Sequence, residues 1–227
     1  DVPDTFVPIV GSEMQFPVRR IYCIGRNYAA HAREMGSDPN REPPFFFQKP
    51  TDAIQNVAPG TVADHPYPTL TKNYHYEVEL VLHISKNGRY IQEHQASRYY
   101  DKITAGIDFT ARDLQRELQK KGLPWEKAKA FDNSAVLGKF IELKQPDFNR
   151  KNINFSLLKN KEEVQKANSS QMIFSFEKII ENISKYFSLN IGDLIFTGTP
   201  AGVGEAVVGD VLEGYIDNQC LLNIEVK

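Results

Sequence analysis

The chain has 227 residues, of which 41% are hydrophobic and 11% aromatic, enough for one sizeable packed core. Its formal net charge of -2 gives no reason to expect a polyanionic partner, so nucleic acid binding is not expected. The longest apolar runs are strand-sized and well short of the about 20 residues that cross a bilayer, so no membrane partner is expected either.

Composition does not shift along the chain, and we expect one domain over residues 1–227 with an N-terminal arm at 1–19. Residues 1–15 are polar and contain prolines, so no signal peptide is expected there. Cys23 and Cys220 fall in apolar, strand-like runs without the spacing of a metal site. We expect two buried, reduced thiols and a cytoplasmic protein, with a single disulfide as the alternative.

The first half of the chain predicts strands joined by turn-rich segments, at residues 18–24, 45–48, 76–84 and 103–109. A short helix is predicted over 27–35, with Asn27 as its N-cap and an end at Gly36. A second helix over 111–121 carries Arg112 and Gln115 on one stripe, because they are three residues apart.

The second half alternates strand-like runs with glycines, at residues 135–143, 153–158, 165–173, 193–197, 210–216 and 221–226. Ser175 is expected to cap an amphipathic helix whose apolar stripe runs from Phe176 to Phe187 and belongs to the core. Strands outnumber helices and follow one another in sequence. This order favours an α+β fold with a mixed or antiparallel, β-rich architecture over a doubly wound one.

Two glutamates one residue apart, Glu77 and Glu79, are the strongest chemical signal in the chain. Side chains alternate across a strand, so both point to one face while Val78 and Leu80 point to the other. Adjacent carboxylates repel each other and are costly to desolvate, which indicates a compensating cation. Oxygen ligands favour hard ions, so we predict Mg²⁺ before Ca²⁺ or Mn²⁺. The alternative is an amphipathic strand whose acidic face meets water.

A third acid, Asp108, falls at the end of the strand predicted over 103–109. With Glu77 and Glu79 it would complete a set of three carboxylates and leave open positions for substrate and water. The alternative is that Asp108 caps the following helix, a common role for aspartate at such a position.

His31 and Glu34 lie three residues apart on the helix predicted over 27–35, and therefore on one face of it. A carboxylate in that position can orient the imidazole, and the pair can then take a proton from water. The alternative for His31 is an ordinary surface or core histidine.

Four runs of sequence, taken in order, resemble the fumarylacetoacetate hydrolase family: 25–36, 76–80, 106–115 and 196–204. The resemblance extends from about Arg20 to the C-terminus. It implies a β-rich roll of mixed sheet with a few short peripheral helices, and usually a homodimer.

The resemblance also implies roles for individual residues. Glu77, Glu79 and Asp108 match the ligands of a Mg²⁺ or Mn²⁺ ion that chelates the 2-oxo acid end of a 1,3-dicarbonyl substrate and stabilises the leaving enolate. His31 and Glu34 match the water-activating pair, which belongs to a helix that orders when substrate binds. Lys129 matches a lysine that polarises the substrate carbonyl or holds its oxyanion.

Further matches concern substrate binding. Arg112 and Gln115 match residues that grip polar groups of the substrate, and a guanidinium suits a distal carboxylate because it bonds in a fork. Thr199 sits in a turn whose amide and hydroxyl can bind the 2-oxo acid carboxylate. Arg26 and Lys49 match residues near the pocket.

Within the family, the sequence is most similar to bacterial fumarylpyruvate hydrolases. We therefore expect an enzyme that hydrolyses 3-fumarylpyruvate to fumarate and pyruvate in gentisate-type aromatic degradation. Alternatives on the same scaffold are acylpyruvate hydrolysis, oxaloacetate decarboxylation and isomerisation of a 2-hydroxyhepta-2,4-diene-1,7-dioate-type diacid. An alternative of another class is a catalytically silent metal-binding or interaction protein.

Overall fold

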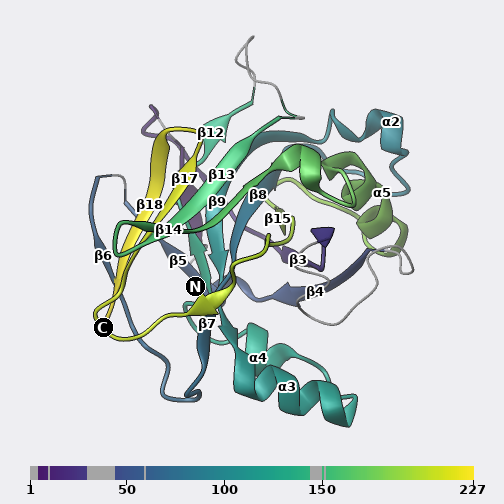
Figure 1. The fold of residues 1–227 in the computed structure, drawn as a ribbon. Coiled ribbons are helices and arrows are strands. Elements are labelled where there is room, and N and C mark those ends of the chain that lie inside the picture. The colour runs from purple at the N-terminus through teal and green to yellow at the C-terminus, as the bar shows by residue number, and fades with distance from the viewer. Residues whose placement is uncertain (1–4, 10, 30–43, 59, 144–149, 151) are drawn as a thin grey trace.

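The computed structural model describes residues 5–9, 11–29, 44–58, 60–143, 150 and 152–227. Strands form most of its regular structure, and Figure 1 shows two large sheets lying against each other with the helices at the periphery. The expected α+β fold of mixed sheet with a few short helices is confirmed.

The larger sheet has eight strands and contains the residues that carry the predicted chemistry. Its order is β4 (Phe45–Lys49), β3 (Ile21–Gly25), β15 (Leu194–Phe196), β8 (Val78–Ile84), β9 (Tyr100–Asp108), β11 (Ala135–Leu137) and β5 (Ile54–Asn56), with β12 (Ile141–Glu142) also paired to β9. Pairs β3/β15 and β5/β11 are parallel and the others antiparallel, so the sheet is mixed.

The second sheet has five strands and packs against the first. Its order is β14 (Glu162–Asn168), β13 (Asn154–Lys159), β17 (Val211–Ile216), β18 (Gln219–Val226) and β6 (Ala63–His65). Strand β13 contacts β8, and strands β17 and β18 contact β9. Apolar residues from both sheets, such as Leu80, Leu157 and Ile224, form one continuous buried core between them. Burial of this core is the main favourable term in folding.

Two small sheets complete the strands of the described residues. One has the order β10 (Thr110–Ala111), β7 (Tyr74–Tyr76) and β16 (Gly204–Glu205); the other pairs β1 (Phe6–Pro8) with β2 (Gln15–Pro17). A separate hydrophobic cluster, which includes Val7, Phe16 and Phe140, covers the other face of the larger sheet.

The helices lie in two groups. Figure 1 shows α2 (Glu93–Ala96) and α5 (Phe176–Tyr186) at one side and α3 (Arg112–Lys121) and α4 (Glu126–Lys129) at the lower end. Two 3₁₀ turns are present: η1 (Thr51–Ala53) connects β4 to β5, and η2 (Ser169–Gln171) connects β14 to α5. Ser175 caps α5 as predicted, by accepting a hydrogen bond from the Lys178 amide.

Helix α3 differs from an ordinary amphipathic helix. Its buried residues are Arg112 and Gln115, whereas its leucines are only half-buried. The face of α3 that meets the rest of the protein is therefore polar, which is unusual for a helix held by apolar packing and points to a site beneath it.

Three predictions need correction. The strand predicted over 76–84 is interrupted at Glu77, between β7 and β8. The segment predicted as strand over 165–173 ends at Asn168, whose side chain caps η2. Cys23 is a buried free thiol as expected, but Cys220 is exposed. The β17/β18 register shifts beside Tyr215, and this irregularity turns Cys220 outward while the next residues are buried.

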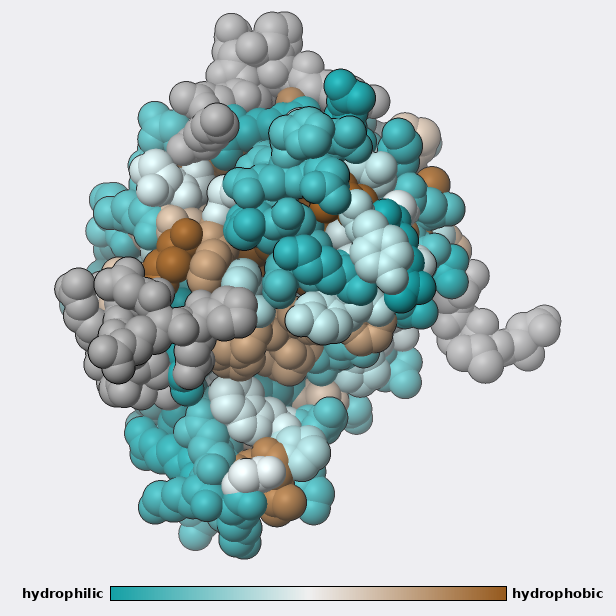
Figure 2. Space-filling model, turned by 90° about the vertical axis from the view of Figure 1, so that its right-hand side faces the viewer, coloured by the Kyte–Doolittle hydropathy of each residue, from teal (hydrophilic) through white to brown (hydrophobic). Residues whose placement is uncertain are grey.

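The surface is mostly polar. On the face in Figure 2 the hydrophobic residues gather near the middle of an otherwise hydrophilic surface. Within the described part of the chain, every helix is too short or too polar to span a membrane.

Candidate metal centre and active site

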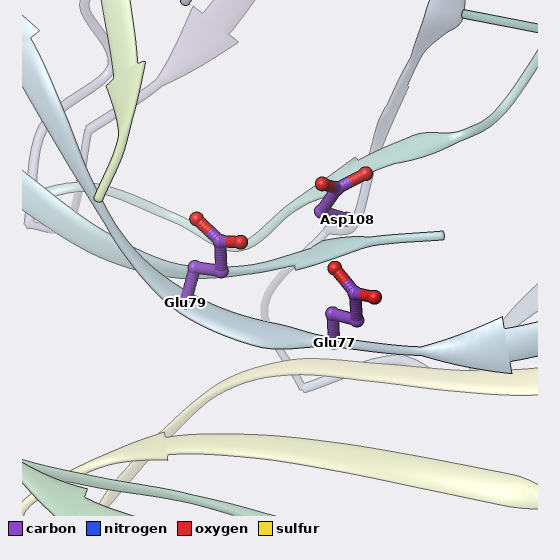
Figure 3. Close-up of side chains that lie close together, drawn as sticks. All are labelled: Glu77, Glu79 and Asp108. Carbon is purple, nitrogen blue, oxygen red and sulfur yellow. The ribbon is translucent and has the colours of Figure 1, made fainter. Parts of the chain in front are cut away.

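Three buried carboxylates, Glu77, Glu79 and Asp108, meet at one point. One oxygen from each lies within 4.8 Å of the others, and the residues are 4%, 2% and 1% exposed. Figure 3 shows the three side chains reaching into a shared space, Glu79 from β8, Glu77 from the residue before it, and Asp108 from the end of the neighbouring β9. The convergence predicted from the sequence is confirmed, and the alternative of a water-facing acidic strand is wrong.

Pairing between β8 and β9 sets this geometry. Glu79 lies opposite Gly106, and the Asp108 amide donates a 2.9 Å hydrogen bond to the Glu77 carbonyl. Residues opposite each other on adjacent strands have neighbouring side chains, so Asp108 comes beside Glu77. Helix α3 has Ala111 as its N-cap, so the alternative role of Asp108 as a helix cap is also wrong.

Three buried cations surround the three acids. Lys129 places its Nζ 2.8 Å from both Glu77 Oε2 and Asp108 Oδ2. Lys49 Nζ lies 2.8 Å from Asp108 Oδ1, and Arg112 donates to Glu77 Oε1. Buried charges are costly unless they are paired, and these pairs offset the cost for Glu77 and Asp108. Although burial disfavours its charge, Asp108 and Glu77 raise the pKa of Lys129, so the lysine is protonated at neutral pH.

Glu79 has a different environment. Its Oε2 accepts a 2.6 Å hydrogen bond from the Gly198 amide, and no ion pair to it is found among the described residues. Burial, together with the charges of Asp108 and Glu77, raises the pKa of Glu79 well above its usual value. Gly198 has φ +102°, and a Cβ there would lie 2.6 Å from Asn27 Cβ, so only glycine fits this close approach.

The residues fit a divalent cation. Three convergent carboxylate oxygens are the donors that Mg²⁺ and Mn²⁺ prefer, and a cation would compensate the charge of Glu79, which forms no ion pair with Lys49, Lys129 or Arg112. Glu79 and Asp108 lie on paired strands of the larger sheet and Glu77 directly precedes β8, so backbone pairing positions the ligands before an ion binds.

The pocket above the carboxylates is lined by most of the predicted site residues. Arg26, Arg112, Gln115, Lys129 and Thr199 all line it with the three acids. Lys49 contacts Asp108 from behind and also donates to Ser134 Oγ at 3.0 Å. Arg112 is buried, at 3% exposed, and donates to Gln115 Oε1 at 2.6 Å.

The predicted water-activating pair, His31 and Glu34, lies outside the described residues. Asn27, the predicted cap of their helix, is fully buried; its amide donates to the Thr197 carbonyl at 2.8 Å and its Oδ1 accepts from the Phe174 amide. Asn27 thus fixes the start of that segment beside the Thr197–Gly198 turn.

Sequence reasoning missed Gln165 on β14. Its Oε1 accepts from the Val78 amide at 2.9 Å, and its Nε2 donates to Thr199 Oγ1 at 2.9 Å. The residue therefore ties the backbone between the two glutamates to the turn that carries Thr199. The only sign of Gln165 in the sequence was a polar residue on the inward face of a strand with alternating burial. This sign is weak, because the sequence does not show what that face packs against.

The sequence comparisons agree with this geometry. Residues 20–226 match the family model described as "Fumarylacetoacetate (FAA) hydrolase C-terminal". The chain belongs to the fumarylacetoacetate hydrolase family. Among curated proteins, it is 36% identical to an oxaloacetate tautomerase of Escherichia coli, over 93% of this chain and 94% of that protein. It is 39% identical to a mitochondrial oxaloacetate tautomerase of Mus musculus, over 92% of each.

Solved structures of family members share the fold. A fumarylpyruvate hydrolase from Pseudomonas aeruginosa, crystallised with Mn²⁺ and pyruvate, is 46% identical with a TM-score of 0.94, covering 98% of this chain and 95% of that one. A family protein of known structure thus binds a divalent metal. The names of these relatives cover two reactions, hydrolysis and tautomerisation.

Proposed function

We propose that this protein is a metal-dependent hydrolase of acylpyruvates, with 3-fumarylpyruvate as its substrate and fumarate and pyruvate as its products. The observation that carries the proposal is the buried set of Glu77, Glu79 and Asp108, with oxygens within 4.8 Å of one another at the floor of a pocket. The similarity to a fumarylpyruvate hydrolase bound to Mn²⁺ and pyruvate supports the choice of substrate.

A divalent cation at the three carboxylates would act as a Lewis acid, withdrawing electron density from a 2-oxo acid and stabilising the negative charge that develops when the C–C bond breaks. Mg²⁺ is the ion we propose in the cell. Glu77, Glu79 and Asp108 contribute the oxygen donors.

Lys129 is the residue to which we assign the substrate oxyanion. An ammonium group has three N–H donors, and two of them reach Glu77 and Asp108 at 2.8 Å. The third is the donor for the substrate carbonyl oxygen. Its raised pKa keeps the charge in place while the carbonyl gains negative charge.

His31 and Glu34 remain our proposed pair for activating water. Asn27 fixes the chain just before them, beside the turn that donates to Glu79. Hydroxide made by this pair would attack the acyl carbonyl, the C–C bond would break, and the electron pair would leave with pyruvate as its enolate.

Oxaloacetate tautomerisation is the second candidate, and the curated relatives favour it. The relatives from Escherichia coli and Mus musculus carry this name at 36% and 39% identity. The reaction also starts from an enolisable 2-oxo acid, so the same carboxylates and Lys129 would serve it. It requires no attack by water and no C–C cleavage.

Activity assays with Mg²⁺ separate the two candidates. The purified protein should consume fumarylpyruvate with loss of diketone absorbance and equal formation of fumarate and pyruvate. Rapid interconversion of oxaloacetate tautomers without cleavage of fumarylpyruvate would replace the hydrolase proposal with the tautomerase. Family resemblance further leads us to propose a cytoplasmic homodimer that acts in gentisate-type degradation.

A further inference from the structure

Helix α3 carries a row of polar side chains that leads away from the carboxylates. Arg112, Gln115 and Gln119 share one face because they are spaced by three and four residues, and all three line the pocket. Gln115 is buried and Gln119 is half-buried. A helix rises about 1.5 Å per residue, so Gln119 lies about 6 Å farther along the axis than Gln115. Gln119 therefore belongs to the outer part of the pocket.

An aromatic wall faces this row. Phe45 and Phe47 alternate on β4 and thus point the same way, and Trp125 packs against both, with ring centroids 5.6 Å and 6.1 Å apart. All three line the pocket. A Cβ on Gly25 would lie 2.1 Å from the Phe45 ring, so glycine at this position allows the ring to lie against β3. The wall is held by packing and offers flat faces and edges to a ligand.

Arg112 is not placed to take the far end of a substrate. Its guanidinium donates to Glu77 and to Gln115, at the inner end of the pocket. The pocket-lining residues that are more exposed than Gln115 and have side-chain N–H donors are Arg26, Gln119 and Trp125. The Arg26 guanidinium lies 5.4 Å from the centre of the Phe45 ring, at the same wall.

We infer that Gln119, Arg26 and Trp125 form a distal subsite, which selects a flat acyl arm that ends in a carboxylate. The inference rests on the proposed hydrolase function and narrows its substrate class. Gln119 and Arg26 donate to the distal carboxylate, because amide and guanidinium N–H groups are its natural partners. Trp125 and Phe45, which pack edge to face, cover the conjugated arm, because a flat arm makes closer contact with an aromatic ring than a saturated, puckered one.

The subsite predicts a preference among acylpyruvates. Fumarylpyruvate has the flat, charged arm; succinylpyruvate has a charged arm of the same length that is saturated; acetylpyruvate has no distal carboxylate. A site built to hydrogen-bond a substrate group discriminates against the analogue that lacks it. We expect kcat/KM to fall in that order, from fumarylpyruvate to acetylpyruvate.

The test compares kcat and KM of the Mn²⁺-loaded wild type, Gln119→Leu and Trp125→Phe on these three substrates. Gln119→Leu should raise KM for both charged substrates by roughly 10- to 100-fold, the loss expected for a hydrogen bond to a charged group, and leave acetylpyruvate unchanged. Trp125→Phe should lower the ratio of kcat/KM for fumarylpyruvate to kcat/KM for succinylpyruvate. Gln95→Leu, at an exposed position of α2, is the matched control and should change none of these values.

The outcomes separate the subsite from the hydrolase proposal. Equal losses on all three substrates for Gln119→Leu, or no loss on any, would overturn the subsite. Wild-type cleavage of acetylpyruvate without a preference for fumarylpyruvate would overturn the subsite and support the hydrolase. Failure of the wild type to cleave any of the three would overturn the hydrolase proposal itself.

Discussion

The two ends of the pocket are held in different ways. At the inner end, three carboxylates and three cations are buried and are fixed by ion pairs and, at Glu79, by the Gly198 amide. At the outer end, the half-buried Arg26 and Gln119 lie beside aromatic rings that are held by packing.

This difference indicates that the two ends of the pocket have separate roles. A buried cluster of paired charges tolerates little change, because removal of one partner leaves another charge without compensation. Substitution of a residue in a half-buried wall of aromatic and amide groups lowers the stability of the protein less. We infer that the inner end sets the chemistry and the outer end sets the substrate. The predictions below test this division, beginning with the inner end.

Removal of one metal ligand should have the largest effect. Glu79→Gln keeps the size of the side chain but loses the negative charge, so divalent metal binding and turnover should both fall to background. Isothermal titration with Mn²⁺ and an acylpyruvate assay measure the two losses. Glu162→Gln, at an exposed position of β14, is the matched control and should behave as wild type. Retained turnover in Glu79→Gln would break the assignment of the inner end.

Lys129→Met tests the assigned oxyanion donor. Loss of one preorganised donor typically lowers kcat by about 10²–10³-fold, and we expect a loss of this order. Metal binding should persist, because Lys129 supplies no oxygen ligand and the three carboxylates remain in Lys129→Met. Lys127→Met changes an exposed lysine of the same helix and should leave kcat unchanged. A fall in metal affinity with unchanged kcat would contradict the role of Lys129.

Gln165→Leu should have a smaller effect, because Gln165 acts through the residues that it positions. It connects the Val78 amide to Thr199 and is 1% exposed. Loss of a partner that orients metal ligands typically costs about 10- to 100-fold in affinity or activity, and we expect a value in that range. Gln165→Glu retains the acceptor to Val78 and should recover part of the metal affinity. Equal metal affinity in wild type, Gln165→Leu and Gln165→Glu would show that Gln165 is not needed to hold the metal ligands in position.

His65 tests the aromatic support behind the carboxylates. Its ring stacks on Phe109, the neighbour of Asp108, at 4.5 Å between centroids, and its Nε2 lies 2.6 Å from the Tyr74 hydroxyl. Burial lowers the pKa of His65 to about 4 from 6.5. The unfolded chain therefore takes up this proton as pH falls through 6.5, and the folded chain only near pH 4.

The contribution of His65 to the free energy of unfolding is constant above pH 6.5 and decreases as pH falls from 6.5 to 4. The full decrease is about 3 kcal/mol, from about 1.4 kcal/mol for each pKa unit. Urea unfolding at pH 7.5 and pH 5 should show a smaller loss of stability at pH 5 in His65→Gln than in wild type. His94→Gln, at an exposed position, should keep the wild-type difference. If the free energy of unfolding fell equally between pH 7.5 and pH 5 in wild type, His65→Gln and His94→Gln, His65 would not be a buried, neutral histidine.

The sequence predicted the inner end better than the outer end, for a physical reason. Alternation along a strand was enough to place Glu77 and Glu79 on one face, and the strand end placed Asp108 near them. This alternation depends only on residues that are adjacent in the sequence, so it can be predicted without knowing the fold. The strand breaks at Glu77, yet the carboxylates of Glu77 and Glu79 still converge as the alternation predicted.

Contacts between distant segments could not be predicted in this way. Arg112 was predicted as a substrate-binding residue, but nothing in the sequence indicated its contact with Glu77, which lies 35 residues earlier. Gln165 reaches Val78 across 87 residues, and Trp125 meets Phe45 only because α4 folds back against β4. Each of these pairings depends on how the sheets and helices pack. Cys220 was misplaced for a related reason, since a register shift reverses the inward and outward positions of its strand.

The central claim is that Glu77, Glu79 and Asp108 share one divalent cation. A crystal of the wild-type protein grown with Mn²⁺, measured for anomalous scattering, tests it directly. We predict one anomalous peak within coordination distance of an oxygen from each of the three carboxylates. A protein that cleaves its substrate while Mn²⁺ is absent from this position, with Lys129 still bridging Glu77 and Asp108, would contradict the account.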